Sequence, residues 1–383
     1  MGGVSMEWKE DVLGNVLEVK YGKDHKKLAD GQYPVYGSGG LMRYVDSKLY
    51  DGPSILIPRK GTLNNIMFVD NPFWTVDTMF WSIINTDKVD PKFLFYSICK
   101  RDFASMNVGS AVPSMTVNIL NDIQISYPKN IDDQRRIASI LSSLDRKIEL
   151  NNKINADLEE MAQAIFKNWF VDFEPFKNGK FVDSELGMIP EGWKVGRLTD
   201  VIKLMPGGTP KTTEPLYWDN GTIPFFSPKD VNGVYCFATE KHITETGLNK
   251  CSSNLYPKDT IFITCRGTVG KVCLAACDMA MNQSNYAIKA IDGYSQYYFF
   301  FLVKSVVERL IKKSNGAVFS AITSKDFDEE ILIPSQKAVE DFTNVIDGFF
   351  RRIFTIGTEN SRLSLLRDTL LPRLMSGELE VPE

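Results

Sequence analysis

The chain has 383 residues, of which 43% are hydrophobic, 24% charged and 11% aromatic, and its formal net charge is −4 at pH 7. This is the composition of a globular protein with room for two or three domains, and it excludes a disordered or fibrous chain. The acidic balance argues against a simple basic nucleic-acid binder. Because no apolar run reaches the roughly 18–20 residues of a membrane span and no signal peptide opens the chain, neither a membrane protein nor a secreted one is expected.

In chain order, residues 1–130 form the first predicted globular part, which we call the first head. Short apolar runs such as Ser54–Ile57 and Phe80–Ile84 predict strands separated by Gly and Pro turns. One helix is predicted over 91–103. A last strand runs to Pro128, and we therefore expect an α+β, strand-rich domain with long loops.

Residues 131–175 predict a first long helix, and 176–190 a linker. Apolar residues alternate in steps of four and three, which is the period of a narrow stripe buried against one partner helix. A helix over 134–170 would span roughly 55 Å and act as a spacer. The stripe consists of Ile137, Leu141, Leu144, Ile148, Asn151, Asn155, Leu158, Ala162, Ile165 and Trp169.

Residues 191–333 form a second strand-rich part, the second head, with a helix predicted over 294–313. Residues 334–383 predict a second long helix and a C-terminal tail. Its stripe consists of Val339, Phe342, Ile346, Phe349, Ile353, Ile356, Asn360, Leu363, Leu370 and Leu374. Two stripes of about five heptads each favour pairing of the two helices as an antiparallel coiled coil, with Asn151, Asn155 and Asn360 fixing its register. The alternative is that each helix packs separately on its own head.

The two heads are copies of one module. Ser54–Thr62 recurs as Thr260–Thr268, and the segment from Gly109 to Thr116 is echoed from Gly316 to Thr323. In both copies a short strand then reaches a proline before the long helix begins. The predicted fold is therefore a pseudo-repeat of two strand-rich heads separated by two long helices.

Motifs for catalysis and for metal binding are missing. The chain has no G-x-G-x-x-G and no phosphate-binding G-x-x-x-x-G-K-[ST], and Asp70–Phe73 lacks the second proline of an amino-methyltransferase signature. Six cysteines form no C-x-x-C pair and predict reduced thiols in the cytoplasm, and His25 and His242 are the only histidines. We expect no catalytic residue, no metal site and no cofactor on this chain.

Local basic-polar clusters recur at matching places in the two heads, whereas the acidic excess lies in the helical parts. Arg or Lys beside Gly suits DNA, because the glycine allows close approach and the cation reaches a phosphate or a guanine edge. Asn64, Asn65, Asn282 and Gln283 could read adenine edges. Taken singly, each cluster could also be a solvated polar loop. The predicted DNA contacts are Lys20, Lys23, Lys26, Lys27, Arg59, Lys60, Thr62, Asn64, Asn65, Ser110 and Ser114 in the first head, and Gly207, Gly208, Thr209, Lys211, Lys229, Arg266, Thr268, Lys271, Asn282 and Gln283 in the second.

Four further sequence segments lie at the boundaries between the heads and the helices or near the end of the chain. They are Ile131-Asp132-Asp133-Gln134-Arg135-Arg136-Ile137-Ala138 entering the first helix, Phe166–Pro175 leaving it, Ser184–Trp193 opening the second head, and Leu371–Leu379 near the end. With these strings nearly the whole chain resembles the specificity subunit of type I restriction–modification systems. One departure is that the second helix opens with Ser335-Gln336-Lys337-Ala338 in place of the Asp-Gln-Arg-Arg entry.

The resemblance implies a non-catalytic subunit in which each head reads one half of a bipartite, gapped site in double-stranded DNA. The helices would dock two copies of an adenine methyltransferase that carries S-adenosylmethionine, and a restriction motor-nuclease subunit would join them. A spacer of fixed length implies that removing one heptad from both helices changes the gap. The alternatives are a stand-alone bipartite DNA-binding or scaffold protein and, with less support, a self-sufficient methyltransferase or nuclease.

Overall fold

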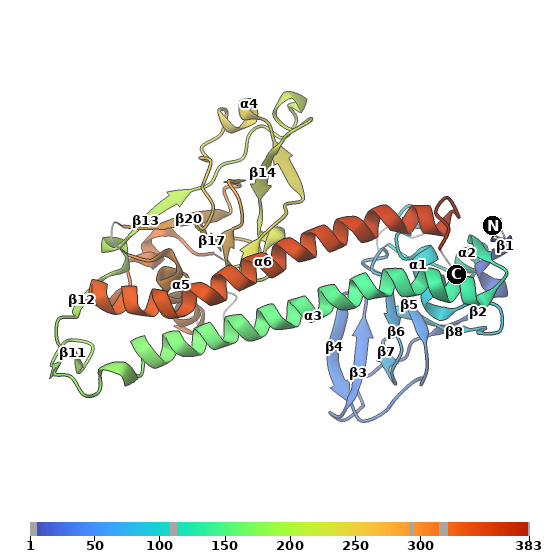
Figure 1. Cartoon of the computed structure of the whole chain (residues 1–383), viewed down its shortest axis with the longest axis horizontal. Coiled ribbons are helices and arrows are strands. Elements are labelled where there is room, and N and C mark those ends of the chain that lie inside the picture. The colour runs from blue at the N-terminus through green and yellow to red at the C-terminus, as the bar shows by residue number, and fades with distance from the viewer. Residues whose placement is uncertain (1–5, 108–112, 292–293, 314–320, 382–383) are drawn as a thin grey trace. The chain divides into compact units, whose positions relative to one another are not determined.

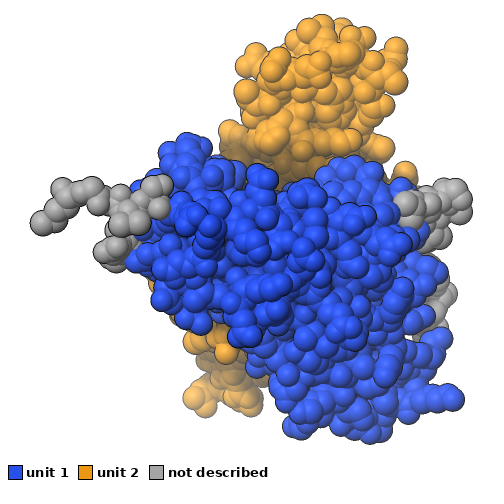
Figure 2. Space-filling view, turned by 90° about the vertical axis from the view of Figure 1, so that its right-hand side faces the viewer, with its two compact units in different colours: residues 1–148, 363–383 blue, residues 149–362 orange. Residues whose placement is uncertain are grey.

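The computed structural model of the chain describes residues 6–107, 113–291, 294–313 and 321–381. The chain divides into two compact units, coloured blue and orange in Figure 2. Unit 1 contains residues 1–148 and 363–383, and unit 2 contains residues 149–362. The first head therefore lies in unit 1 and the second head in unit 2.

Unit 1 contains a four-stranded sheet of order β2-β8-β5-β6, a three-stranded sheet of order β4-β3-β7 and the pair β1-β9 (Figure 1). The strands predicted near 54–57, 80–84 and 123–128 are confirmed. The elements of this unit are β1 (Trp8–Val12), β2 (Leu17–Tyr21), β3 (Tyr33–Gly37), β4 (Gly40–Val45), β5 (Ser54–Pro58), β6 (Met67–Val69), β7 (Trp74–Thr75), β8 (Met79–Ile84), α1 (Pro91–Ile98), α2 (Val117–Asn121) and β9 (Gln124–Pro128).

Helix α1 ends earlier than its predicted boundary at residue 103. Its N-terminus is capped by Asp90, whose carboxylate accepts a hydrogen bond from the backbone N–H of Phe93 at 2.9 Å. After Ile98 the chain continues in tight turns, with Arg101 N donating to Ile98 O and Phe103 N donating to Arg101 O. These turns bury Phe103 completely.

Unit 1 also contains the first part of helix α3 (Ile131–Phe170) and the last turns of helix α6 (Gln336–Met375). Ile137 and Leu141 share one hydrophobic core with Leu371 and Leu374. Asp145 connects three elements, since it accepts a hydrogen bond from the Tyr96 hydroxyl at 2.5 Å and forms an ion pair with Arg367 at 2.8 Å. Burial, together with this hydrogen bond to a carboxylate, raises the pKa of Tyr96 and keeps its hydroxyl a donor.

Unit 2 contains a five-stranded sheet of order β13-β20-β17-β18-β15, a three-stranded sheet of order β16-β14-β19 and the pairs β12-β21 and β10-β11 (Figure 1). Its other elements include helix α5, which begins within two residues of the prediction. The bounds are β10 (Phe181–Val182), β11 (Ile189–Pro190), β12 (Lys194–Arg197), β13 (Ile202–Pro206), β14 (Ile223–Phe226), β15 (Tyr235–Cys236), β16 (Lys241–Ile243), α4 (Glu245–Leu248), β17 (Ile261–Thr264), β18 (Val272–Ala275), β19 (Ala280–Met281), β20 (Asn285–Ala290), α5 (Gln296–Lys313) and β21 (Glu330–Ile333).

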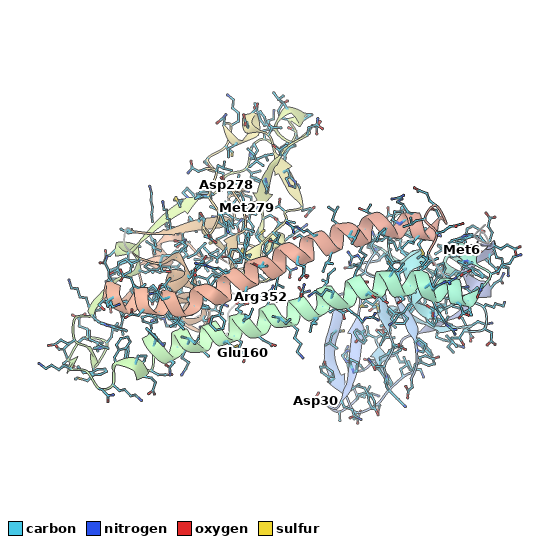
Figure 3. All side chains as sticks on the ribbon, in the orientation of Figure 1. Met6, Asp30, Glu160, Asp278, Met279 and Arg352 are labelled. Carbon is cyan, nitrogen blue, oxygen red and sulfur yellow. The ribbon has the colours of Figure 1, made fainter. Side chains whose placement is uncertain are left out.

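The repeat predicted from the sequence is confirmed in the sheet topology. The antiparallel neighbours β2-β8-β5 of the first head match β13-β20-β17 of the second. The parallel pair β3-β7 matches β14-β19, and the antiparallel pair β1-β9 matches β12-β21. An isolated β-bridge also recurs, since Tyr50 pairs with Phe73 in the first head and Tyr256 pairs with Met279 in the second. Met279 is buried and is labelled in Figure 3.

The core of unit 2 is rich in aromatic rings. Phe166 of α3 is only 2% exposed and lies 5.3–6.0 Å, between ring centroids, from four other rings. These rings belong to Phe170, Tyr298, Phe301 and Phe342. Phe166 and Phe170 do not lie on the predicted stripe. Helix α3 therefore carries a second apolar face in unit 2, and this face packs on α5 and α6.

Every position of the two predicted stripes is buried or half-buried, whereas Glu160 and Arg352 on the same helices are exposed (Figure 3). Within unit 2, two of the three predicted register residues, Asn151 and Asn360, are in contact. The Asn151 side-chain amide donates to Asn360 Oδ1 at 2.8 Å, and Asn360 in turn donates to Asn152 Oδ1 at 2.8 Å. Asn155 is half-buried, and its Oδ1 has no hydrogen-bond partner within the described part of the chain.

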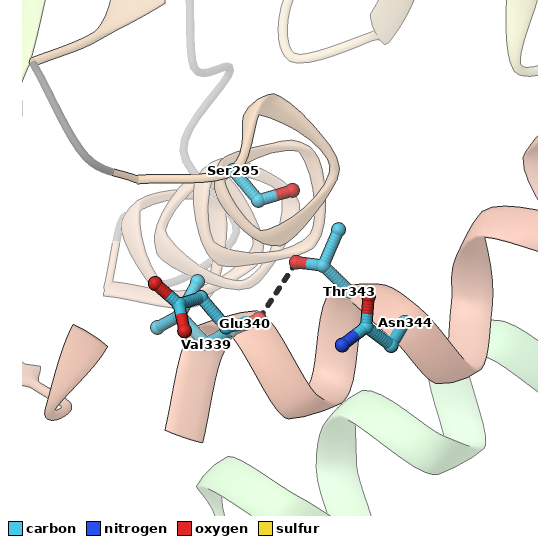
Figure 4. A pocket seen from close by; sticks show the side chains of 5 residues that line it. All are labelled: Ser295, Val339, Glu340, Thr343 and Asn344. Carbon is cyan, nitrogen blue, oxygen red and sulfur yellow. Dashed lines mark hydrogen bonds between the residues drawn. The ribbon is translucent and has the colours of Figure 1, made fainter. Parts of the chain in front are cut away.

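The Asp-Gln-Arg-Arg entry of α3 has an internal role. Gln134 is 0% exposed; its Oε1 accepts from Asp90 N at 2.7 Å and its Nε2 donates to the carbonyls of Lys88 and Pro128. In the first turn of α6 the buried residues are Ala338 and Val339, whose side chains cannot make such bonds. A pocket of about 340 Å³ lies there, lined by Ser295, Val339, Glu340, Thr343 and Asn344 (Figure 4). The different sequence at the start of α6 thus means that the second head lacks the three internal hydrogen bonds that Gln134 makes in the first head.

All six cysteines are free thiols, as predicted. Burial raises the pKa of Cys99 to about 11 and that of Cys236 and Cys265 to about 12, so these three thiols stay protonated near neutral pH. Within the described ranges, no helix is both long and apolar enough to cross a membrane.

Candidate nucleic-acid interface

Three strand ends of unit 1 bring the predicted contacts of the first head together. Strands β2 and β5 end, and the antiparallel β8 begins, at the same end of the four-stranded sheet. Backbone hydrogen bonds join the loops there: Gly22 N donates to Met79 O and Arg59 N donates to Thr78 O, both at 2.9 Å. The loops after β2 and β5 therefore form one surface, which we call the sheet end of the head.

Lys60 and Arg59 are the central cations of this sheet end. Lys60 is exposed and pairs through a backbone bridge with Ser114, so the two predicted segments meet. The Arg59 guanidinium lies 5.5 Å from the centre of the Tyr21 ring and donates to the backbone oxygen of Asp77 at 3.2 Å. Arg59 is thereby held in place, whereas Lys60 is free to reach a phosphate or a base.

Of the remaining predicted contact residues in the first head, some have exposed side chains and others form hydrogen bonds or ion pairs within the head. Lys23, Lys26, Lys27 and Thr62 are exposed, and Lys20 forms an ion pair with Glu18. Asn64 is engaged through both ends of its amide, donating to Asp102 and accepting from Ala104 N, and therefore ties two loops of the head together. Asn65 donates to Ser38 O at 2.8 Å. The predicted contact Ser110 lies outside the described residues.

The second head repeats this arrangement with the ends of β13 and β17 and the start of β20. Arg266 stands where Lys60 does: it is exposed and its backbone pairs with Ala321, as Lys60 pairs with Ser114. The glycine that follows has a positive φ in both heads, +89° at Gly61 and +78° at Gly267, which favours glycine at this turn.

A pocket of about 530 Å³ opens at the sheet end of the second head. Six predicted contacts line it: Thr209, Lys229, Arg266, Thr268, Asn282 and Gln283. The structure thus brings together residues from four separate stretches of the sequence. Lys211 and Lys271 are exposed. They do not line the pocket.

Gly207 and Gly208 are buried. A Cβ atom on Gly207 would meet Asn282 O at 2.0 Å, and one on Gly208 would meet the Ser252 hydroxyl at 2.2 Å. These glycines therefore permit a close approach between loops of the head itself. Gly22 does the same in the first head, where a Cβ would meet Val76 O at 2.0 Å.

Sequence reasoning missed Trp218 and Lys241, which also line the pocket. The Lys241 ammonium lies 5.6 Å from the centre of the Trp218 ring, and this ring contacts Phe225 edge-on at 5.3 Å. Neither residue belongs to a segment that recurs in the first head. Only the fold could show that they join the pocket.

The site holds cations, amides and hydroxyls, which are donors for phosphates and base edges. Among the described residues, no three His, Cys, Asp or Glu side chains lie close enough together to hold a metal ion.

Comparison with known proteins decides the family. Residues 6–160 and 190–351 match the model of the type I restriction modification DNA specificity domain. The chain belongs to this family. Each of the two matched segments contains one head and part of its following helix, so the specificity domain occurs twice, in agreement with the repeat.

Relatives of the specificity-domain family align over most of the chain. The MjaIX specificity subunit of Methanocaldococcus jannaschii is 28% identical over 376 residues, covering 94% of this chain and 86% of that protein. The HindI specificity subunit of Haemophilus influenzae is 26% identical, covering 82% and 83%. The crystal structure of the S subunit from M. genitalium has a TM-score of 0.58 at 16% identity, covering 97% of both chains, and shares the fold.

Proposed function

We propose that this chain is the DNA-specificity subunit of a type I restriction–modification complex and that each head reads one half of a bipartite, gapped site. The observation that carries the proposal is the recurrence of one exposed cation, Lys60 and Arg266, at the same backbone position of two equivalent sheet ends. Family membership supports the same function. The chain would act in the cytoplasm as the non-catalytic, DNA-reading part of a larger enzyme.

This proposal assigns a role to each of the five segments that were predicted from the sequence. Residues 1–130 and 191–333 are the recognition domains, 131–175 and 334–383 are helical regions, and 176–190 is a linker. The helical regions pair as an antiparallel coiled coil. Support comes from the polar contacts of Asn151 with Asn360 in unit 2 and of Asp145 with Arg367 in unit 1. Linking two weak half-site binders raises their joint affinity through effective concentration.

The catalytic subunits are partners in this proposal. The helical regions dock two adenine methyltransferase subunits, which carry the S-adenosylmethionine, and the motor-nuclease subunit joins that assembly. Relatives that are named as specificity subunits of restriction enzymes support this assignment.

The test is co-expression of the full chain with the adenine methyltransferase encoded beside it, followed by single-molecule sequencing of host DNA for N6-methyladenine. A new methylated motif in two parts with a gap of fixed length is expected. If both proteins are produced and associate but no new methylation appears, the proposal is wrong and a binding-only scaffold is favoured.

Replacing Lys60 with alanine should weaken recognition of one half-site, and replacing Arg266 with alanine should weaken the other. Each change removes an exposed cation, and loss of one such contact costs about 1–3 kcal/mol when it reads a base. The measurement is a binding titration on duplexes altered in one half-site at a time. Lys194→Ala, an exposed change on β12, serves as the control. Equal losses on both half-sites from either variant would contradict the assignment.

A further inference from the structure

Gln283 of the second head and Asp77 of the first occupy the same place in the repeat. Backbone hydrogen bonds on both sides fix this equivalence. Cys265 N donates to Ser284 O as Arg59 N donates to Thr78 O, and Asn282 N donates to Phe226 O as Val76 N donates to Tyr36 O. Both side chains are exposed at the sheet end. One side chain is an amide and the other a carboxylate.

In the second head, contacts within the pocket occupy the amide oxygens. Gln283 Oε1 accepts a hydrogen bond from the Thr209 hydroxyl. Asn282 Oδ1 accepts from Ser284 N at 2.9 Å and from Asn285 Nδ2 at 2.7 Å. Each amide is therefore held with its oxygen turned to the protein. The side-chain NH2 groups of Asn282 and Gln283 have no acceptor within the described part of the chain.

Arg266 adds a third donor to the same pocket. Its side chain is exposed and makes no ion pair with any described residue. The guanidinium carries only N–H donors, and a free side-chain NH2 group is likewise a donor. The lip of the pocket formed by Arg266, Asn282 and Gln283 thus presents mainly donors, and its one remaining amide acceptor is the second lone pair of Gln283 Oε1.

Hydrogen-bond donors in this pocket would favour a base whose major-groove edge presents acceptors. Adenine is read bidentately by an amide that donates to N7 and accepts from N6, which requires an unused lone pair on the amide oxygen. Guanine presents two acceptors, N7 and O6, on its major-groove edge. Asn282 Oδ1 accepts two hydrogen bonds and has no lone pair left, and Gln283 Oε1 already accepts one from Thr209. The donors of the second head therefore match guanine better than the adenine edge that was expected for Asn282 and Gln283 from the sequence.

The first head carries an acceptor at the position equivalent to Gln283, next to the donor Lys60 that corresponds to Arg266. The carboxylate of Asp77 only accepts hydrogen bonds, and Asn65 donates one of its two N–H groups to Ser38 O while its Oδ1 remains an acceptor. A carboxylate is repelled by phosphates, so its partner in DNA is a base. Acceptors match the exocyclic amino groups of cytosine and adenine.

We propose that Arg266, Asn282 and Gln283 read a guanine in the second half-site, and that Asp77 at the equivalent position reads an exocyclic amino group in the first. This inference rests on the proposed function and adds the chemistry by which the two copies of one module come to recognise different sequences. A change from amide to carboxylate at one repeat position reverses the hydrogen-bonding preference, while the fold around it is kept.

The experiment uses the full chain in complex with its methyltransferase. The half-site read by the second head is first identified as the one weakened by Arg266→Ala. Each guanine of that half-site is then replaced in turn by 7-deazaguanine, which still pairs with cytosine but lacks the N7 acceptor. At one position binding should fall roughly ten-fold, the loss expected for a base contact within the 1–3 kcal/mol range. A second half-site without guanine on either strand overturns the proposal.

Three variants test the residues themselves. Gln283→Glu should abolish the preference for guanine at that one position, and Asp77→Asn should change one position of the first half-site only. Thr209→Val frees Gln283 Oε1, so adenine should become acceptable at the same position. Gln336→Glu, which introduces the same charge at an exposed position of α6, is the control and should leave the motif unchanged.

The outcomes separate this inference from the proposed function. If the wild-type complex methylates a bipartite motif but Gln283→Glu and Thr209→Val, both shown by circular dichroism to be folded, give the wild-type motif, the inference is wrong and the proposed function stands. If the wild-type complex methylates no specific motif, the proposed function fails, and this inference fails with it.

Discussion

Replacing Phe166 with alanine should lower the free energy of unfolding of unit 2 by about 3–5 kcal/mol, the usual cost of emptying a fully packed phenylalanine site. The ring is 2% exposed and contacts rings contributed by both α5 and α6. The neighbouring helices cannot close over the cavity without losing their other contacts, so little of the lost packing is recovered. Equilibrium urea denaturation followed by circular dichroism measures the change.

Met161→Ala is the matched control for this prediction. Met161 lies on the same helix, but its side chain is 53% exposed. Its truncation should alter the free energy of unfolding by less than about 0.5 kcal/mol, as surface substitutions usually do. Similar losses for the two variants would mean that the aromatic cluster does not contribute to the stability of unit 2.

Replacing Gln134 with leucine should destabilise unit 1 by about 2–4 kcal/mol, because a buried polar group left without a partner costs about 1–3 kcal/mol. The variant keeps the apolar volume but loses three hydrogen bonds at once. The N–H of Asp90 and the carbonyls of Lys88 and Pro128 would lose their partner, and the Pro128 carbonyl lies at a buried residue.

Gln124→Leu makes the same chemical change at an exposed position of β9 and is the control. Denaturation curves of the two variants should differ in midpoint. A Gln134→Leu protein as stable as this control would show that the Asp-Gln-Arg-Arg entry is not an internal clamp, and docking of a partner would then be the better explanation for it.

The repeat and the helix stripes could be predicted from the sequence because their signals are local or periodic. Ser54–Thr62 and Thr260–Thr268 carry the same order of apolar, basic and glycine residues, and the structure places both at the end of a central strand. The second apolar face of α3, with Phe166 and Phe170, was missed. A helix that contacts two partners carries two overlapping stripes, and the stronger period hides the weaker one.

The candidate site was predicted in part for a similar reason. Lys60 and Arg266 were found because they recur. The position of Trp218 and the orientation of the Gln283 amide were not found. Both depend on contacts between residues far apart in the sequence, such as Thr209 with Gln283, and no local pattern marks such a contact.

Residues 363–383 belong to the same compact unit as residues 1–148. On the ribosome, all of unit 2 is therefore synthesised before the last part of unit 1 leaves the exit tunnel. Leu371 and Leu374 cannot fill their places in the first core until then, nor can Arg367 reach Asp145. The core of the part of the protein made first can thus be completed only when the part made last is available.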